Sequence, residues 1–584
     1  MLAPAIAAAG VSAIPSPIPA LQTLAPGITY QREVIAGGEV IHVVRIAPGG
    51  LTTLQPVFVS GAVDARGDLA RATRTLGSQG AVASVNGDFF NFDQAYPSGL
   101  TITAGQGLAS TPNPLRSSLL IAPSGLLGLG RVRLAASWTP VATDGSALAA
   151  TGTISGLNQP AVYPSEVMLF TPAYGRAIAP LPARLPAGTA GRTPTAEDSA
   201  TIAPDEPGLL EPNQARTGRV VANSTARGAR IPAGDLVLTG VGPAAASIAA
   251  RLPVGARVRL QVLIGGLAPG TQALGGGPAI VVGGHAVHNA GEGFVPGQLT
   301  PRSQRTAIGQ TATGIDLLVT VEGPGQRSPG ITVPQQADLM ARLGARTAIA
   351  MDSGGSSQMI VNGADVMPWS SPREISTAAV VRYAGVRVSR LAAPISPNGD
   401  GVDDTVHAGI TVPSPGTLVV ALGAAHRRTL TLFDGAVAAV PTGVGLNPAR
   451  LGLPDGSYRL TATLTTTTGA VSRDTRVVVV DRTLGHLVAR RLIRRGAPHE
   501  QIIFRLARAA TVTVRITTRA GRLLAVPLSR RRLGAGSHAV VWNQRHGRSL
   551  VSGGAVVTVT ATTALGTHGL TEPIALARAP RGHH

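Results

Sequence analysis

Hydrophobic and polar positions along the chain form short runs that predict β-strands joined by turns. Alternation of the two kinds at Arg257–Leu263 is typical of a strand with one buried face, and the apolar runs Ile315–Val321 and Thr347–Met351 predict two more strands. Between these two runs, apolar residues recur at helical spacing from Thr332, which can cap a helix, to Gly344, which can end one. The middle of the chain is therefore predicted to fold as strand, helix, strand.

A polar loop follows the second of these two runs. Asp352–Ser357 reads Asp-Ser-Gly-Gly-Ser-Ser, which combines a carboxylate and hydroxyls with glycines that permit the close approach of a ligand. Gln358–Val361 then continues as a strand, and Asn362-Gly363 is a hairpin signal. On pattern alone, a ligand-binding loop and a plain connection between strands are equally good interpretations.

A second candidate loop lies nearer to the N-terminus. Leu69–Leu76 is predicted as a helix and Ala81–Val85 as a strand, which runs into the segment Asn86–Phe92. This arrangement would present the polar side chains of Asn86 and Asp88 at the end of the strand, where a ligand can reach them.

Four segments resemble signatures of one family. Asn86–Phe92 (NGDFFNF) is similar to an NGDFF motif, Gln304–Gly309 (QRTAIG) to an RTAIG motif and Met351–Ser357 (MDSGGSS) to an LDGGGS motif, while Pro368–Thr377 resembles a closing segment. These motifs are typical of the phosphodiester glycosidase family, whose domain many secreted bacterial proteins share. The resemblance covers about residues 28–385, for which we expect an α+β catalytic domain with a mixed sheet.

The resemblance implies hydrolysis of a sugar-1-phosphodiester bond. The leaving group of that reaction is a weakly basic phosphate monoester, so the site mainly needs cations on the phosphate and a carboxylate near the anomeric carbon. Asp352 is the expected nucleophile or base, with Asp88 or Glu322 as its partner. Arg305 offers a bidentate fork for phosphate oxygens. The expected substrate-binding residues are Asn86, Arg305, Thr306, Gly354, Gly355, Ser356, Ser357 and Arg373.

The same loops also fit a second class of protein. In a noncatalytic glycan- or cell-wall-binding protein they would hold a ligand without turning it over. Both hypotheses involve a glycan or sugar-phosphate ligand, and they differ in whether a product is released. The sequence shows no cofactor requirement for catalysis and leaves open whether a metal assists it.

The N-terminal residues and one internal segment lack regular patterning. Residues 1–27 are rich in Ala and Pro and resemble the end of a signal peptide, although no basic residue precedes Arg32. We predict a leader or a disordered N-terminus there, and a secreted or cell-surface protein. Residues 180–217 are rich in Pro, Ala, Gly and acids, which predicts an insertion or flexible loop. No run reaches the ~18–20 uncharged apolar residues of a membrane span.

Charge changes this picture mainly in the C-terminal third. The chain has no cysteine, a formal net charge of +20, and 50 basic residues that are all Arg. From Val386 onward there are 25 Arg and 9 acids, and between Arg482 and Arg548 there are 15 Arg and one acid, Glu500. Either a genome-wide codon bias or selection for binding an anionic cell-wall polymer would produce this pattern. The scarcity of interleaved aromatic residues disfavours nucleic acid as the partner.

The segment Pro394–Thr405 resembles the opening of bacterial immunoglobulin-like modules. Its candidate calcium ligands are Asn398, Asp400, Asp403 and Asp404, whose oxygens recur at short spacing among glycines that permit a tight loop. An Asx-rich turn without metal explains the same residues, so a structural Ca²⁺ ion and a plain turn both stay open.

An internal repeat predicts two such modules. Gly456–Leu464 aligns with Gly553–Ala561 at an offset of 97 residues, and Gly536–Asn543 resembles a strand of flagellar hook-capping-type immunoglobulin-like domains. A repeat of ~100 residues suits a β-sandwich. We therefore expect two all-β immunoglobulin-like sandwiches, at residues 386–481 and 482–584, of which the second carries an Arg-rich face.

Overall fold

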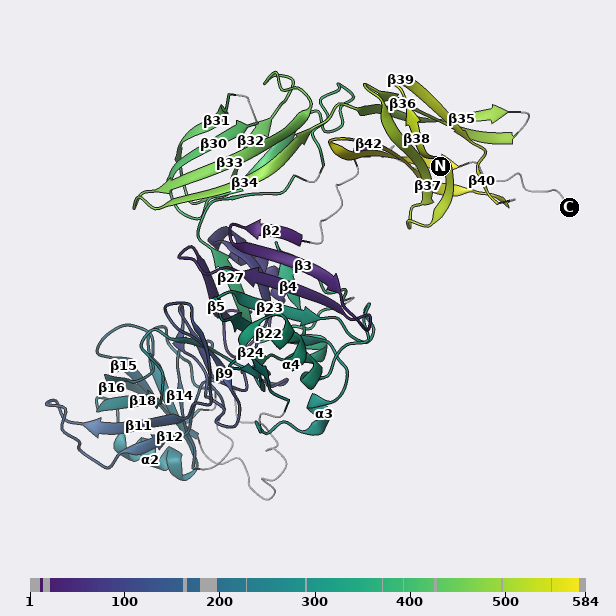
Figure 1. The fold of residues 1–584 in the computed structure, drawn as a ribbon. Helices are drawn as coiled ribbons and strands as arrows, with labels where there is room; N and C mark the ends of the chain where they lie inside the picture. The colour runs from purple at the N-terminus through teal and green to yellow at the C-terminus, as the bar shows by residue number, and fades with distance from the viewer. Residues whose placement is uncertain are drawn as a thin grey trace, which may run out of the picture. The chain divides into compact units, whose positions relative to one another are not determined.

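The computed structural model divides the chain into two compact units, an N-terminal unit of residues 20–384 and a C-terminal unit of residues 385–584 together with the first residues of the chain (Figure 1). The expected boundary at residue 385 lies beside this division. The structure describes residues 11–13, 21–160, 165–178, 197–226, 228–288, 291–369, 371–391, 393–424, 428–494, 497–547 and 549–576.

Strands dominate both units, and the expected α+β class with a mixed sheet is wrong. The described residues form 43 strands but only four α-helices, namely α1 (Leu69–Thr75), α2 (Pro243–Arg251), α3 (Pro296–Leu299) and α4 (Val333–Arg342). Among the named strand pairs of the described chain, only β13 with β14 is parallel. The predicted helices do form, but they are too short to make up a layer of comparable size to the sheets.

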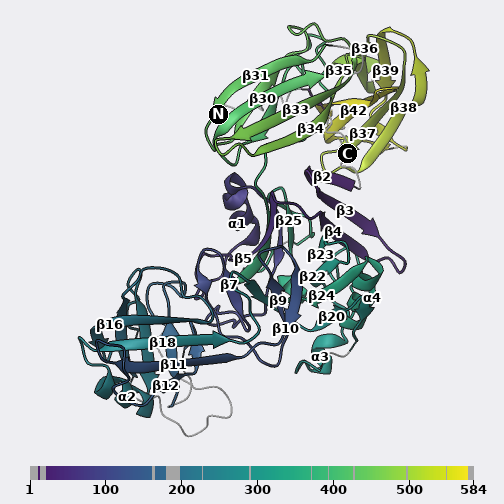
Figure 2. The same cartoon turned by 60° about the vertical axis from the view of Figure 1, so that its left-hand side comes forward.

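An eight-stranded sheet lies at the centre of the N-terminal unit. Its strands, in spatial order, are β2 (Leu21–Ala25), β3 (Ile28–Val34), β4 (Val40–Ile46), β23 (Asp316–Val321), β22 (Arg305–Thr311), β24 (Ala345–Ala350), β20 (Ala279–Val282) and β21 (His285–Ala286). The predicted strand, helix, strand order is confirmed here by β23, α4 and β24. The Thr332 side chain caps α4 by accepting a hydrogen bond from the Gln335 N–H, and apolar residues of α4 pack on one face of the sheet (Figure 2).

The other face of this sheet packs against a five-stranded sheet. The strands of that second sheet, in spatial order, are β26 (Ala364–Asp365), β25 (Met359–Val361), β6 (Ala81–Asn86), β27 (Thr377–Tyr383) and β5 (Thr52–Phe58). Ile308, Leu318 and Ile349 from the first sheet share one hydrophobic core with Val85 and Met359 from the second. β6 of the second sheet packs across this core from β22 and β24 of the first sheet. The ends of these three strands therefore lie close together.

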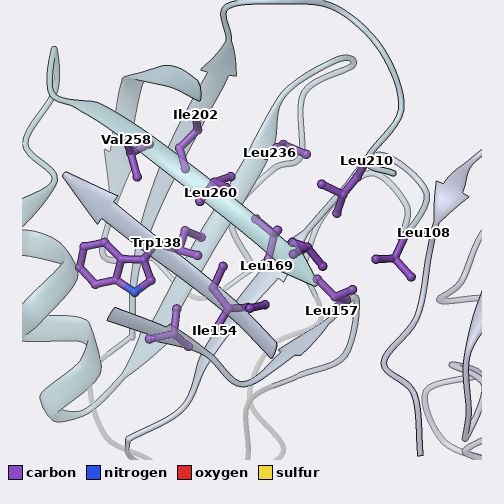
Figure 3. Close-up of a cluster of buried hydrophobic side chains, with 14 of the residues drawn as sticks. Leu108, Trp138, Ile154, Leu157, Leu169, Ile202, Leu210, Leu236, Val258 and Leu260 are labelled. Atoms are coloured by element: carbon purple, nitrogen blue, oxygen red, sulfur yellow. The ribbon is translucent and has the colours of Figure 1, made fainter. Parts of the chain in front are cut away.

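A third sheet joins this sandwich to a second lobe of the N-terminal unit. Its strands are β10 (Leu127–Gly130), β9 (Ser118–Ile121), β19 (Gln272–Gly275), β7 (Thr101–Thr103) and β8 (Gly107–Leu108). The second lobe is an eight-stranded sheet of β12 (Gly152–Ile154), β11 (Leu134–Val141), β18 (Arg257–Ile264), β16 (Gln214–Ser224), β15 (Glu197–Pro204), β17 (Leu236–Val241), β14 (Val167–Phe170) and β13 (Gly156–Leu157). Its hydrophobic core includes Trp138, Leu169 and Leu260 (Figure 3).

Two expectations about irregular segments need correction. Within the expected insertion, residues 197–204 form β15 and residues 214–217 begin β16, and Ala200 and Ile202 of β15 belong to the core of the second lobe. Residues 180–196 lie outside the described residues. Within the expected leader, residues 21–25 form an edge strand of the central sheet and pair with β3. No helix in the described parts of the chain is long and apolar enough to cross a membrane.

The C-terminal unit consists of two halves, each with two main sheets and a hydrophobic core of its own. The first half contains β28 (Arg387–Val388), β29 (Val406–Thr411), β32 (Thr442–Leu446), β31 (Leu430–Val437), β30 (Gly416–Gly423), β33 (Gly456–Thr466) and β34 (Val471–Val480). The second contains β35 (Leu484–Arg494), β36 (Ala497–Leu506), β39 (Gly536–Trp542), β1 (Ser12–Ala13), β43 (Gly566–Leu576), β42 (Gly553–Thr563), β37 (Ala510–Thr518) and β38 (Leu523–Leu533), with β40 (Arg545–His546) and β41 (Ser549–Leu550) as a small hairpin. The repeated segments occupy equivalent strands, β33 and β42, while the immunoglobulin-like assignment stays a prediction.

Candidate functional site

The Asn86 side chain joins three segments that are far apart in the sequence. Its Nδ2 donates to the backbone oxygen of Asp352 at 2.8 Å, and its Oδ1 accepts from Thr306 Oγ1 at 2.7 Å and from the Gln358 N–H at 3.1 Å. Asn86 and Thr306 are buried, so neither can touch a ligand directly. Both were expected to bind substrate, and the structure gives them the task of holding the loop at Asp352 in place.

A pocket of about 320 Å³ opens above this junction. Its lining includes three aromatic rings, two guanidinium groups, hydroxyls and one carboxylate, from Phe89, Phe92, Phe294, Ser303, Arg305, Asp352, Ser353 and Arg373. Among the described residues of that lining, Asp352 is the only ionisable acid. The pocket therefore has the mixed apolar and polar walls of a small-molecule site, with one acid available for chemistry.

The Asp352 carboxylate is held by short local contacts. Its Oδ1 accepts from the Ser353 N–H at 2.8 Å, and the Ser356 hydroxyl donates to it as well. Burial raises the pKa of Asp352, whereas these hydrogen bonds and the charges of Arg373 and Arg116 lower it. The Asp352 N–H donates to the Gly87 oxygen at 3.0 Å, which fixes the backbone from which the carboxylate projects. A fixed carboxylate beside cations can act as a nucleophile or a base.

Arg305 reaches the pocket wall, but its donors are already engaged. Its Nε donates to the Ile331 oxygen at 3.1 Å, its Nη1 to the Gln298 oxygen at 3.3 Å, and its Nη2 to the Pro301 oxygen at 2.7 Å. Its Nη1 also donates to Ser353 Oγ at 3.2 Å. Burial lowers the pKa of Arg305 to about 10, so it keeps its charge at neutral pH. The predicted phosphate fork thus serves to tie three loops around the pocket.

The glycine and serine residues of the loop at Asp352 shape the floor of the site. Ser356 and Ser357 are buried, and Ser356 Oγ accepts from Arg373 Nη1 at 3.2 Å. A Cβ atom on Gly355 would lie 2.8 Å from Arg373 Nη2, so a larger residue there would displace this guanidinium. Gly354 has φ +63, which also favours glycine. The loop therefore positions Arg373, which is exposed and lines the pocket.

Asp88 lies beneath the pocket and does not line it. Its side chain is 3% exposed; Oδ2 accepts from the Gly99 N–H at 2.7 Å, and no residue of the described chain hydrogen-bonds to Oδ1. Burial raises the pKa of Asp88 to about 7, against the lowering effects of the Gly99 N–H and the Arg116 charge, and the Asp352 charge raises it further. Asp88 is thus placed to influence the site without touching a ligand in the pocket.

We expect the pKa of Asp88 to show in the pH dependence of stability. Because the folded pKa of about 7 exceeds the usual aspartate pKa of 3.8, the folded state binds the proton more tightly than the unfolded state. The stabilisation is complete below pH ~4 and is lost as the pH rises through ~7, at about 1.4 kcal/mol per pH unit. In Asp88→Asn, the free energy of unfolding measured with urea should lack this pH dependence. The stability of the variant relative to the wild type should therefore rise between pH 4 and 7. Parallel curves for the two proteins would contradict the raised pKa.

The structure does not bring Glu322, the second expected partner, to the pocket. Its carboxylate is fully buried just after β23, next to the neighbouring strand β4. There it accepts from His42 Nε2 at 2.9 Å and from Arg327 Nε at 3.0 Å. Tyr30 continues this chain through a hydrogen bond of 2.8 Å to His42 Nδ1. Although burial raises the pKa of Glu322, the hydrogen bonds from Arg327 and His42 lower it below its usual value. Glu322 anchors the turn after β23.

Two residues that contact the pocket lining or its supporting strand, Arg116 and Glu292, were not predicted from the sequence. The Arg116 guanidinium carbon lies 5.1 Å from the ring centre of Phe89 and 4.4 Å from that of Phe294. Glu292 is buried and accepts from both the N–H and the hydroxyl of Ser117, each at 2.7 Å, which fixes the strand next to Arg116. Arg116 is a single arginine in a Pro-containing loop, so no local spacing marks it in the sequence.

A second cavity lies at the opposite end of β22 and contains none of the expected site residues. It measures about 490 Å³ and is lined by turns and by Gln272, Gln310 and Asp316. Burial raises the pKa of Asp316 to about 6. Since Asp352, Arg305 and the family-like motifs all meet at the first cavity, that cavity is the candidate active site.

Three of the four candidate calcium ligands make side-chain hydrogen bonds to backbone groups. Asp404 Oδ1 and Oδ2 accept from the Gly399 and Gly401 N–H groups, each at 2.8 Å, and Asp400 Oδ2 accepts from the His486 N–H at 2.8 Å. Asn398 Nδ2 donates to the Leu484 oxygen at 3.0 Å. Within the described parts of the chain, no group of three or more His, Cys, Asp or Glu residues is placed to hold a metal ion. The loop ties the two halves of the C-terminal unit together, and a bound Ca²⁺ ion stays a prediction.

The chain resembles a curated protein over a short segment and a solved structure at low sequence identity. A curated relative, an uncharacterized SPbeta prophage-derived protein of Bacillus subtilis (strain 168), is 40% identical over 65 residues, which are 11% of this chain and 10% of the relative. The chain thus matches about a tenth of that protein's length. A candidate exported protein of Burkholderia pseudomallei is 24% identical, with a TM-score of 0.46 over 60% of this chain and 76% of the other.

A family comparison matches the part of the chain that forms most of the pocket. The zebrafish N-acetylglucosamine-1-phosphodiester α-N-acetylglucosaminidase catalytic domain is 14% identical, with a TM-score of 0.29 over 64% of this chain and 87% of the other. The model of the phosphodiester glycosidase family matches residues 214–382, which include Arg305, Asp352 and Arg373. At family level, the match over these residues supports a glycosidase-type hydrolase.

Proposed function

We propose that the pocket hydrolyses the bond between a sugar anomeric carbon and a phosphodiester, in a surface or extracellular glycan. The observation that carries the proposal is the position of Asp352, a fixed carboxylate that faces a pocket with two guanidinium groups in its wall. The carboxylate suits a developing positive charge at the anomeric carbon, and the cations suit the phosphate. The family match of residues 214–382 supports the same reaction class.

In this proposal, the glycosidic C–O bond breaks and its electron pair leaves with the phosphate oxygen, while water adds to the anomeric carbon. Asp352 acts as the nucleophile or as the base that takes a proton from the water. The leaving phosphate needs little protonation because it is a weak base. Asp88, buried beneath the site, is a positioning residue in this scheme.

Hydrolysis of a nitrophenyl or UDP-linked α-N-acetylglucosamine phosphodiester tests the proposal. We expect release of free sugar, and in ¹⁸O-labelled water we expect the label on the sugar. A label on phosphate would mean that the P–O bond breaks, which overturns the glycosidase assignment. No turnover of any sugar phosphodiester would favour the noncatalytic glycan- or wall-binding alternative.

The second half of the C-terminal unit is rich in Arg between residues 482 and 548. This composition supports a further part of the proposal, namely that the secreted protein is retained on an anionic cell-wall polymer. Arg530–Arg532 are exposed on β38. Replacing these three arginines by glutamine in the full chain should weaken retention on teichoic acid at low salt, because surface attraction is screened within ~10 Å at 0.1 M salt. The control replaces the exposed Arg66, Arg71 and Arg259 of the N-terminal unit, with the same change in charge. Equal losses in both variants would show non-specific charge attraction only.

A further inference from the structure

We propose that Arg116 and Arg373, and not Arg305, hold the phosphate of the substrate, and that this pair selects an anionic leaving group over a neutral one. The inference rests on the proposed function of the pocket and names the groups that recognise the substrate. It reassigns a role that the sequence motif gives to Arg305.

The first step is the state of the donors. Arg305 uses four of its five N–H donors on the oxygens of Ile331, Gln298, Pro301 and Ser353. If Arg305 turned toward a phosphate, those buried or partly buried acceptors would lose their partners, which is costly. Arg305 therefore positions Ser353, the neighbour of Asp352, and its charge is already committed to backbone carbonyls.

Arg116 is in the opposite state. Across the described residues, its guanidinium has no hydrogen-bond or ion-pair partner, and it stacks near the rings of Phe89 and Phe294, at 5.1 and 4.4 Å from their centres. Stacking engages the face of a guanidinium and leaves its in-plane N–H donors available for oxygens. Both rings line the pocket, and the Arg116 charge lowers the pKa of Asp352, so the cation acts at the reacting carboxylate.

Arg373 is arranged in a similar way. Its guanidinium carbon lies 5.2 Å from the ring centre of Phe92, and the only hydrogen bond of the guanidinium within the described chain is the one from Nη1 to Ser356 Oγ at 3.2 Å. Arg373 is exposed, lines the pocket, and also lowers the pKa of Asp352 through its charge. Each of the two arginines thus contacts an aromatic ring of the pocket and has N–H donors that are available to a ligand.

The charges of the filled site support this pair. An ionised Asp352 and a phosphodiester together carry two negative charges, and Arg116 and Arg373 carry two positive charges. Arg305 adds a third positive charge, so a neutral glycoside would leave two of the three cations without a counter-charge, whereas a diester supplies a second negative charge. Because charge-assisted hydrogen bonds are strong where water is partly excluded, this second charge is a source of discrimination between leaving groups.

Selectivity measurements test the pair. The kcat/KM for a nitrophenyl sugar phosphodiester is divided by that for the neutral nitrophenyl glycoside of the same sugar. In Arg116→Gln and in Arg373→Gln we expect this ratio to fall about 100-fold, as for removal of one charged contact to a developing anion. Arg133→Gln, an exposed control on the same unit, should keep the wild-type ratio. An unchanged ratio in both pocket variants overturns the inference while the proposed hydrolysis stands.

Binding without turnover separates the two proposals. In the Asp352→Asn protein, calorimetry measures the affinity for N-acetylglucosamine 1-phosphate and for N-acetylglucosamine alone. We expect Arg116→Gln and Arg373→Gln to weaken the phosphate ligand about 10-fold or more and to leave the neutral sugar little affected. This result without any turnover by the wild type would retain the phosphate site and reject hydrolysis. If either glutamine variant fails to fold, Arg116→Lys and Arg373→Lys keep the charge but lose the planar fork, and no change in phosphate affinity in them overturns the pair.

Discussion

Asp352→Asn is expected to lower kcat for a sugar-1-phosphodiester by at least about 10³-fold, because the amide can neither attack the anomeric carbon nor accept a proton from water. The amide keeps the size of the carboxylate and can still accept from the Ser353 N–H, which donates to Asp352 Oδ1 at 2.8 Å. The fold should therefore survive. Initial rates of free-sugar release, with unfolding curves of both proteins, measure the effect.

The matched control for this substitution is Asp93→Asn. Asp93 is an exposed acid next to Phe92, at the rim of the pocket, and its loss changes the net charge by the same amount. We expect its kcat to stay within about threefold of the wild type, as for a surface substitution away from the reacting atoms. Retention of more than a tenth of the activity in the Asp352 variant would remove that residue from the chemistry.

Asn86→Asp should cause the largest loss of stability among single substitutions at the site. The new carboxylate oxygen would face the Asp352 backbone oxygen, to which the amide now donates at 2.8 Å. It would also be a buried charge, since Asn86 is 1% exposed. Lost hydrogen bonding and charge burial together should reduce the free energy of unfolding by about 3 kcal/mol or more at neutral pH, as urea denaturation measures.

Thr306→Val provides a graded comparison. It removes one hydrogen bond of Asn86, the one from Thr306 Oγ1 at 2.7 Å, and keeps the shape of the side chain. A loss of about 1–2 kcal/mol is expected. If both variants unfold at the wild-type urea concentration, Asn86 does not hold the site together, and the contacts at β6, β22 and β24 must be redundant.

Local rules predicted several elements of the fold well. α4 begins after Thr332 because the Thr332 hydroxyl accepts from the Gln335 N–H and the Gln335 side chain reaches back to the Thr332 N–H, a reciprocal pair that can be read from sequence. The hairpin at Asn362-Gly363 forms with φ 49 and 79, as that dipeptide favours. In both cases, residues within four positions of each other decide the conformation.

Other parts of the fold depend on contacts between distant segments and were not predicted. The second lobe was only partly anticipated, because β15 is an Ala- and acid-containing segment whose strand character comes from pairing with β16 and β17. Composition there suggested a loop. A segment without alternating apolar residues can still form a strand when it pairs with neighbouring strands. The nearly all-β class therefore could not be predicted from short stretches of sequence.

The candidate site was predicted in its location and only partly in its roles. Motifs placed Asp352 and Asn86 near each other because both follow strands, but the sequence does not show which backbone oxygens will take the donors of Arg305. It also does not show that Glu322 turns toward His42. Arg116 belongs to the site only through two rings, Phe89 and Phe294, of which the second is 178 positions away from it.

The hydrogen bond between Asn86 and Asp352 spans 266 residues of chain. At about 5–20 residues per second of synthesis, tens of seconds pass between the emergence of the first and the last of these groups from the ribosome. A nascent chain is inert throughout that interval, and so is any chain that crosses a membrane unfolded. Activity can begin only where the finished polypeptide folds, which ties the place of catalysis to the place of folding.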